Sequence, residues 1–206
     1  TGVQTCALPI SYGRRVTVLA GPGNNGADGI VAAERLAAAG VGIDLFRIAE
    51  GFDPAELDRA LRRADLVIDA MYGTGFRDAL GGAAEVAARA VAAAGVPVLA
   101  VDIPSGVDGL TGEVRGSAMA ADVTVCFASL KQGLCAEPGR TRAGSVRVVD
   151  IGIDPGPVRL YVLDPDDLAL LRRAPDAHKW TTAALVVRSE EHTSELQSHH
   201  DLVCRL

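Results

Sequence analysis

Short apolar runs rich in Val, Ile and Leu alternate with amphipathic, alanine-rich segments through most of the chain. Runs of the first kind are typical of buried strands, and segments with apolar residues at helical spacing are typical of helices. We predict strands at residues 14–20, 42–48, 66–70, 98–103, 122–127 and 145–151, and helices at residues 29–39, 54–63 and 82–94. Strand–helix repetition at this spacing predicts right-handed βαβ crossovers, and therefore an α/β fold with an open, mostly parallel sheet.

The predicted helices have recognisable start and stop residues. Asp53 can cap the second helix, and Pro54 occupies the first helical position, where its missing N–H costs nothing. Gly40 and Gly95 follow the other two helices, where glycine commonly ends a helix.

The two ends of the chain do not follow this pattern. Residues 1–10, TGVQTCALPI, and residues 188–206 have no periodicity of either kind. One DNA sequence that encodes residues 1–10 has a reverse complement that encodes SEEHTSELQ, which lies in the second segment. We therefore expect both ends to be translated sequencing adapter, and the genuine segment to be about residues 11–187.

Composition narrows the class of protein. The chain is 49% hydrophobic but only 4% aromatic, which suits small apolar helices on a buried parallel sheet. A net charge of −6 argues against a nucleic-acid or acidic-membrane partner. No apolar run reaches the roughly 18 residues of a membrane span, and no signal-peptide layout is visible, so we expect a cytoplasmic protein. Cys126 and Cys135 have no metal-site spacing, and we expect reduced thiols.

Four polar, glycine-rich loops follow predicted strands. They are residues 21–29, 69–80, 102–112 and 128–134. The carboxyl ends of parallel strands meet at one edge of a sheet, where such folds bind their ligands. These loops are longer and more polar than the roughly 2–6 residues that a plain connection needs. The sequence therefore predicts a ligand site at this edge.

The first loop, GPGNNGADG, leaves three interpretations open. Its glycines fit the G-x-G-x-x-G of dinucleotide-binding loops, and Arg47 could then meet a 2′-phosphate. Asp28 disagrees with this interpretation, because a carboxylate at the start of a helix repels a diphosphate. Asn24 and Asn25 add carbonyl oxygens, which suit a hard cation or a sugar. Another nucleotide or sugar-phosphate site and a purely structural turn are the alternatives.

The candidate residues in the other loops each have a structural alternative. Asp69 precedes a flexible Gly73-Thr74-Gly75, whose N–H groups suit an anion, but a strand-to-helix turn uses the same residues. Asp102, near Ser105, is a candidate general acid or base, or a turn-capping residue. Lys131 is a candidate phosphate contact or a solvated side chain.

Four motifs in one order carry a resemblance to a known family. VLAGPGNNGADG, VIDAMYGTGF, VDIPSGVDGLTG and FASLKQGL together resemble the NAD(P)H-hydrate epimerases, the YjeF N-terminal domain family. The resemblance covers about residues 14–153, and four motifs in register make it specific.

The resemblance implies a Rossmann-like, three-layer α/β/α fold and a repair reaction. Members of the family interconvert the R and S epimers of NADH or NADPH hydrated at nicotinamide C6, and their site holds a potassium ion. Carried over to this sequence, the potassium ligands are Asn25, Asp69 and Ser105. The positions that bind the hydrate are Asn24, Asn25, Gly26, Ala27, Asp28, Gly73, Thr74, Gly75, Phe76, Arg77, Asp78, Ala79 and Asp102, to which we add Lys131 as the phosphate contact.

Asp102 is our candidate for the acid–base group. Inverting C6 requires a bond at that carbon to break and re-form. If the hydroxyl leaves and water returns, one carboxyl can donate and then accept the proton. Ring opening and reclosure is a competing route, and the sequence does not choose between them. Ala27 stands where the family more often has glycine, a change that we expect the loop to tolerate.

The resemblance also implies a domain organisation. We expect residues 11–153 to form the epimerase domain, residues 154–174 a linker, and residues 175–187 the start of an ADP- or ATP-dependent dehydratase domain. A dehydratase domain cut this short is expected to be inactive. Family members have one or two helices before the first strand, so we expect the epimerase domain to lack them; they would cover the core or form a dimer contact.

Two alternative functions predict different properties. A non-catalytic nucleotide- or partner-binding module would show a degraded site, whereas the candidate site residues are all present. An NADP-dependent oxidoreductase would bind intact NADPH and transfer hydride. The expected partner is a small molecule, hydrated NADH or NADPH, and a homodimer is compatible with the sequence.

Overall fold

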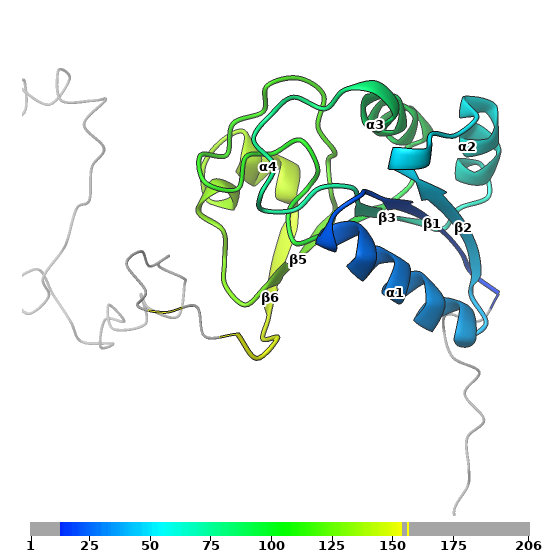
Figure 1. The fold of residues 1–206 in the computed structure, drawn as a ribbon, viewed down its shortest axis with the longest axis horizontal. Coiled ribbons are helices and arrows are strands. Elements are labelled where there is room, and N and C mark those ends of the chain that lie inside the picture. The colour runs from blue at the N-terminus through cyan, green and yellow to red at the C-terminus, as the bar shows by residue number, and fades with distance from the viewer. Residues whose placement is uncertain (1–12, 154–155, 157–206) are drawn as a thin grey trace, which may run out of the picture. The chain divides into compact units, whose positions relative to one another are not determined.

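Six parallel strands form one sheet in the part of the chain that the computed structural model describes, residues 13–153 and Gly156 (Figure 1). The strands are β1 (Arg15–Ala20), β2 (Gly42–Arg47), β3 (Leu66–Ala70), β4 (Val98–Val101), β5 (Val123–Phe127) and β6 (Ser145–Val149). Their order across the sheet is β2-β1-β3-β4-β5-β6, and every neighbouring pair is parallel. The predicted α/β class is confirmed, and the sheet is parallel throughout rather than mostly so.

The helices lie between these strands along the chain. Within the described residues they are α1 (Asn24–Ala38), α2 (Pro54–Leu61), α3 (Gly82–Ala94) and α4 (Gly139–Ala143), with short 3-10 helices η1 (Ile48–Glu50) and η2 (Gln132–Leu134). The predicted caps are confirmed. Asp53 accepts a hydrogen bond from the Ala55 N–H at 2.9 Å. Gly95 ends α3 in the left-handed conformation, with φ 65°.

Helix α1 corrects one prediction. It begins at Asn24, whereas the sequence predicted residue 29, so the polar part of the first loop is already helical. Asn and Gly are poor helix formers, and their composition favours a loop. The first turn tolerates them because its N–H groups have no helical partner in any case. The first helical bond runs from Ala27 N–H to Gly23 O at 3.1 Å, so the polar residues open the helix at the sheet edge.

The sheet is covered by helices on both faces (Figure 1). Successive strand residues point to opposite faces, so Val18 packs in a cluster with Ala33 of α1. Its neighbour Leu19 packs in the other large cluster, with Leu57 of α2 and Ala87 of α3. The three-layer α/β/α arrangement implied by the resemblance is therefore confirmed.

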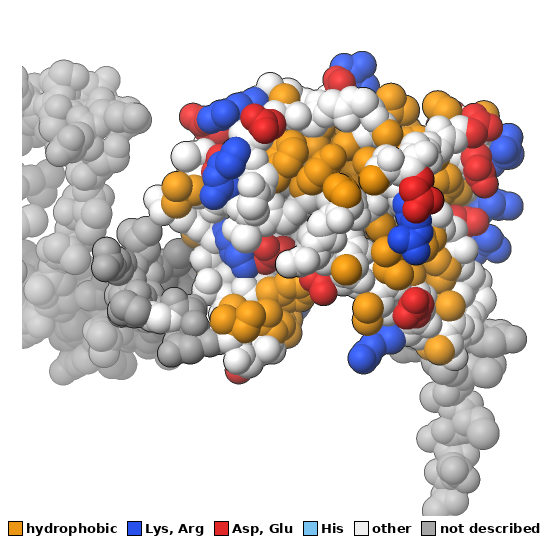
Figure 2. Space-filling view, viewed as in Figure 1, with side chains coloured by type: hydrophobic (Ala, Val, Ile, Leu, Met, Phe, Trp, Pro, Cys, Tyr) orange, Lys and Arg blue, Asp and Glu red, His pale blue; other side chains and the backbone are white. Residues whose placement is uncertain are grey.

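The surface of the described part carries charges of both signs. On the face shown in Figure 2, acidic and basic side chains are interspersed around hydrophobic patches, with no broad area of one sign. Within the same residues, no helix has both the length and the apolar character needed to cross a bilayer.

The edge of the sheet that should bind a ligand lies where the strand order reverses. β1 lies between β2 and β3 in the sheet. The chain leaves β1 toward β2 on one side and leaves β3 toward β4 on the other, so the two loops diverge at this edge. Gly21 N–H donates to Ala70 O at 3.0 Å and ties the ends of β1 and β3 together. A Cβ on Gly21 would lie 1.7 Å from the Met71 carbonyl oxygen, so only glycine allows this approach.

The predicted adapter, linker and dehydratase segments lie outside the described residues, apart from Gly156, and stay predictions. They are residues 1–10, 154–174, 175–187 and 188–206.

Candidate functional site

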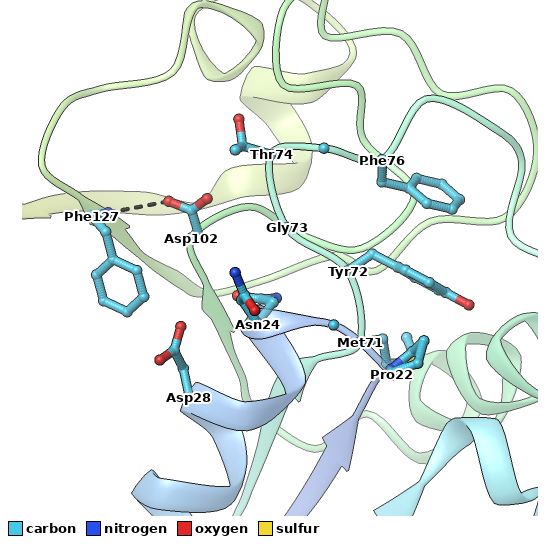
Figure 3. Close-up of a pocket in the computed structure, with 13 residues that line it drawn as sticks. Pro22, Asn24, Asp28, Met71, Tyr72, Gly73, Thr74, Phe76, Asp102 and Phe127 are labelled. Atoms are coloured by element: carbon cyan, nitrogen blue, oxygen red, sulfur yellow. Dashed lines mark hydrogen bonds between the residues drawn. The ribbon is translucent and has the colours of Figure 1, made fainter. Parts of the chain in front are cut away.

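A cavity of about 470 Å³ opens at the carboxyl edge of the sheet. Its walls come from the start of α1, the loop after β3, and the ends of β4 and β5. Figure 3 shows the Asp28 and Asp102 carboxylates and the Asn24 amide around one part of the cavity, with Tyr72 and Phe76 on the other side. The residues that line it are Pro22, Gly23, Asn24, Asn25, Asp28, Met71, Tyr72, Gly73, Thr74, Gly75, Phe76, Asp102 and Phe127.

The structure brings most of the predicted site residues to this cavity, but not all. Gly26 is buried behind the wall, and Ala27 is an exposed helical residue, where a methyl group meets solvent. Arg77 turns back on its own loop, donating to Thr74 O at 2.8 Å, and Asp78 and Ala79 are exposed outside the cavity. These five predicted positions therefore lie next to the cavity but do not line it.

Asp69 and Ser105 form a buried pair beneath the cavity. Asp69 is 0% exposed and Ser105 is 1% exposed. Ser105 donates its hydroxyl to Asp69 Oδ1 at 2.6 Å and its backbone N–H to Oδ2 at 2.7 Å. The Ser105 hydroxyl in turn accepts from Tyr72 N–H at 2.9 Å. The pair thus joins the end of β3, the loop after β4 and the cavity wall.

Burial dominates the electrostatics of Asp69. Loss of water raises the pKa of its carboxyl to about 6, against the opposing hydrogen bonds from Ser105 and Met71. No cationic side chain bonds to it among the described residues. A buried carboxylate without a counter-charge is a position where a cation would be stabilising.

Asn25, next to Gly73 in the cavity wall, adds a second unmatched polar group. Its amide nitrogen is buried and has no hydrogen-bond partner in the described part of the chain. A Cβ on Gly73 would lie 3.3 Å from Asn25 Cγ, so glycine lets the loop after β3 approach the first turn of α1. Buried amide groups are nearly always satisfied, so an orphan at a candidate site points to a ligand.

Asp102 is held at one carboxylate oxygen and is free at the other. Its Oδ1 accepts from Phe127 N–H at 3.2 Å and from Lys131 Nζ at 2.5 Å. Its Oδ2 has no hydrogen-bond partner among the described residues, and the residue lines the cavity. A carboxylate oriented in this way can exchange a proton with a bound ligand.

The backbone at Asp102 is left-handed, with φ 69°. This conformation is uncommon for residues other than glycine and is found at functional sites when the surrounding structure holds it. Here Asp102 N–H donates to Val125 O at 2.8 Å. Directly after the neighbouring strand β5, Ala128, with φ 61°, donates its N–H to Val149 O at 2.9 Å.

The aromatic part of the cavity was not predicted as a unit. Tyr72 and Phe76 stack with ring centroids 4.5 Å apart and an interplanar angle of 28°. Phe76 was among the predicted positions, whereas Tyr72 and Phe127 were not. The sequence contained a signal for this pair. Only 4% of the chain is aromatic, yet Tyr72 and Phe76 stand four residues apart after one strand. They give the site an apolar surface for a planar ring.

Comparison with known proteins identifies relatives over most of this chain. The family model described as YjeF-related protein N-terminus matches residues 4–55 and 46–133. An NAD(P)H-hydrate epimerase of Weissella koreensis is 34% identical over 170 residues, which are 74% of this chain and 76% of the relative. One of Limosilactobacillus fermentum is 38% identical, over 66% of this chain and 74% of that protein.

A longer relative and a solved structure complete the comparison. The bifunctional NAD(P)H-hydrate repair enzyme Nnr of Thermofilum pendens is 34% identical over 86% of this chain, which spans 38% of that enzyme. The crystal structure of the yeast protein ynu0 (YNL200c) matches with a TM-score of 0.54 and 18% identity, over 86% of this chain and 79% of the yeast chain. The structural match supports the fold, and the sequence matches support common ancestry with these relatives. The chain therefore belongs to the YjeF-related N-terminal family.

Proposed function

We propose that this chain interconverts the R and S epimers of hydrated NADH and NADPH, as the names of its relatives indicate. The observation that carries the proposal is Asp102, whose carboxylate is anchored through Oδ1 and presents Oδ2 to the cavity. Epimerisation at C6 needs one group that takes a proton and returns it. Such a group contributes about 100-fold to 10,000-fold to a rate.

The other residues of the cavity bind and orient the nucleotide. The stacked pair Tyr72 and Phe76 offers an apolar surface to a base or a nicotinamide ring. Asn24 and Asp28 line the same cavity and suit hydroxyl groups of a sugar.

Three residues in or directly behind the cavity wall fit a potassium ion. Asn25, Asp69 and Ser105 offer amide, carboxylate and hydroxyl oxygens, which hard cations prefer. The observation that supports the fit is the buried Asp69 carboxylate, which has no cationic partner among the described residues. Among the described residues no group of three His, Cys, Asp or Glu side chains offers the ligand set of a transition metal. When bound, potassium would supply positive charge that stabilises the Asp69 carboxylate and the loops around it.

The buried Asp69 makes stability depend on pH and on potassium. Its pKa is about 6 when folded and 3.8 in the reference state, so the folded protein favours the protonated form. Without potassium, the contribution of Asp69 to the free energy of unfolding should fall as pH rises from 3.8 to about 6, by about 3 kcal/mol in all, and stay low above that. Urea unfolding of wild type and a variant without this carboxyl, in tetramethylammonium buffers between about pH 4 and about pH 7, measures this loss as a difference.

Potassium should reduce this loss, because it binds the ionised, folded form. The matched variant is Asp69→Asn, which has no charge to bury. The difference in unfolding free energy between wild type and Asp69→Asn should depend on pH in tetramethylammonium and less so in potassium chloride. A difference that is the same at every pH would show that Asp69 does not titrate in this way.

The proposed function is tested with purified protein, potassium and a non-equilibrium mixture of NADPH-hydrate epimers. Chromatography should show R-to-S conversion faster than the spontaneous rate, in proportion to enzyme concentration. A folded protein that binds the hydrate but does not accelerate its conversion would instead be a binding module. Reduction or oxidation of a test substrate with NADPH would indicate an oxidoreductase.

A further inference from the structure

We propose that Lys131 is a positioning residue that presents Asp102 to the substrate as a carboxylate base, so that C6 is inverted by opening and reclosing the ring. This inference rests on the proposed epimerase function and goes beyond it, because it assigns a role to Lys131 and selects a reaction route.

Lys131 contacts Asp102 and the backbone of β5 rather than solvent. Its Nζ donates to Asp102 Oδ1 at 2.5 Å and to the Phe127 carbonyl oxygen at 2.6 Å. Its side chain is 14% exposed, and that of Asp102 is 10% exposed. A charge-assisted hydrogen bond between two largely buried groups is stronger than a solvated one and fixes the orientation of both. The Asp102 carboxylate therefore cannot rotate freely to exchange Oδ1 and Oδ2.

The same contacts argue against the phosphate contact that the sequence suggested. Lys131 is absent from the lining of the cavity. Its charge already faces the carboxylate of Asp102, and a second of its three donors is used by Phe127 O. A substrate phosphate would have to displace a buried ion pair to reach it, which is costly.

The ion pair between Lys131 and Asp102 indicates that Asp102 first accepts a proton from the substrate rather than first donating one. An ammonium group at hydrogen-bond distance stabilises the Asp102 anion, so the free Oδ2 meets the substrate ready to accept a proton. Loss of the C6 hydroxyl as water would need a group that arrives protonated. Removal of the proton from that hydroxyl needs only the base that the structure shows.

The resulting steps balance without any added reagent. Asp102 Oδ2 takes the proton of the C6 hydroxyl, the C6–N1 bond breaks, and its electron pair goes to N1, where the C2–C3 double bond and carboxamide delocalise it. C6 becomes an aldehyde. Rotation of the aldehyde turns its other face to N1, the C6–N1 bond re-forms, and Asp102 returns the proton to the oxygen. The hydroxyl oxygen is never lost to water.

Steady-state kinetics of Lys131→Met distinguish positioning from binding. We expect kcat to fall about 100-fold with KM within about threefold of wild type, since Lys131 acts through Asp102 and not on the substrate. A phosphate contact would instead raise KM and leave kcat unchanged, which would overturn the inference. Lys131→Arg should recover part of kcat, and the exposed Arg89→Met on α3 is the matched charge control.

A double variant separates this role from a general effect on the fold. In an Asp102→Asn background, Lys131→Met should lower kcat no further, because the base on which Lys131 acts is gone. A further fall of the same size as in wild type would show that Lys131 acts elsewhere, and would overturn the inference.

The route is tested in water enriched in ¹⁸O, with mass spectrometry of the epimerised hydrate. We expect wild type to convert many molecules without taking up ¹⁸O beyond the enzyme-free control. Uptake of one ¹⁸O per conversion would show loss and return of water, and would overturn the ring-opening route. If wild type does not accelerate epimerisation at all, the proposed function itself fails and this inference falls with it; failure confined to the variants or the isotope leaves the function standing.

Discussion

Asp102→Asn is expected to lower kcat for epimerisation by about three orders of magnitude. Asparagine keeps the shape of the side chain and tolerates the left-handed backbone found at this position, φ 69°. Its amide can still accept hydrogen bonds from Phe127 N–H and Lys131 at the atom equivalent to Oδ1. It cannot take up a proton and return it. The effect should therefore fall on the chemical step, with little change in KM.

Epimer interconversion followed under saturating substrate measures this loss, with far-UV circular dichroism as the check on folding. Asp58→Asn is the matched control, since it makes the same chemical change on an exposed position of α2. A folded Asp102→Asn protein that keeps kcat within threefold of wild type would remove Asp102 from its assigned role.

Gly21→Ala is expected to have the largest effect on stability. The new Cβ would lie 1.7 Å from the Met71 carbonyl oxygen and 2.6 Å from its carbonyl carbon, both of them backbone atoms. Relief requires the ends of β1 and β3 to separate, which breaks the bond from Gly21 N–H to Ala70 O. We expect a loss of about 3 kcal/mol or more, a large part of the roughly 5–15 kcal/mol that stabilises a typical domain.

Urea denaturation at fixed pH and potassium concentration measures this loss. Gly75→Ala is the matched control, because it adds the same methyl group at a cavity-lining position with no atom within 4 Å. It should change the free energy of unfolding by less than about 1 kcal/mol. Equal losses of unfolding free energy in the two variants would mean that the steric clash at Gly21 is not the cause of the destabilisation.

The sheet could be predicted from the sequence because its signals are local. The run from Leu66 to Ala70 and the helix from Gly82 to Ala94 were predicted at the bounds observed. Their apolar spacing and flanking residues are contained within the segments themselves. Helix α4 was missed because its five residues, Gly139–Ala143, are too few to show a helical period. The early start of α1 was missed for a different reason, since glycine and asparagine favour a loop by composition.

The candidate site was only partly predictable, because its geometry depends on residues far apart in the chain. The ends of β3 and β4 indicated Asp69 and Asp102 as site residues. Nothing near Asp69 in the sequence indicates that Ser105 donates to both of its oxygens, from 36 residues away. Lys131 similarly follows an apolar strand, and its local sequence suggests a solvated or phosphate-binding side chain. Its ion pair with Asp102 arises only because β4 and β5 are neighbours in the sheet.

Two left-handed residues, Asp102 in the site and Ala128 after β5, connect the site to β6, an edge strand of the sheet in the described part of the chain. The conformation of Asp102 is held by a hydrogen bond to Val125 of β5, and the end of β5 is held in the same way, by the bond from Ala128 to Val149 of β6. Edge strands ordinarily accept substitutions freely, because one side pairs with nothing. Here a change that loosens β6 would relax β5 and then the backbone of Asp102, the proposed acid–base residue. Selection for activity should therefore extend to a strand that never touches the substrate.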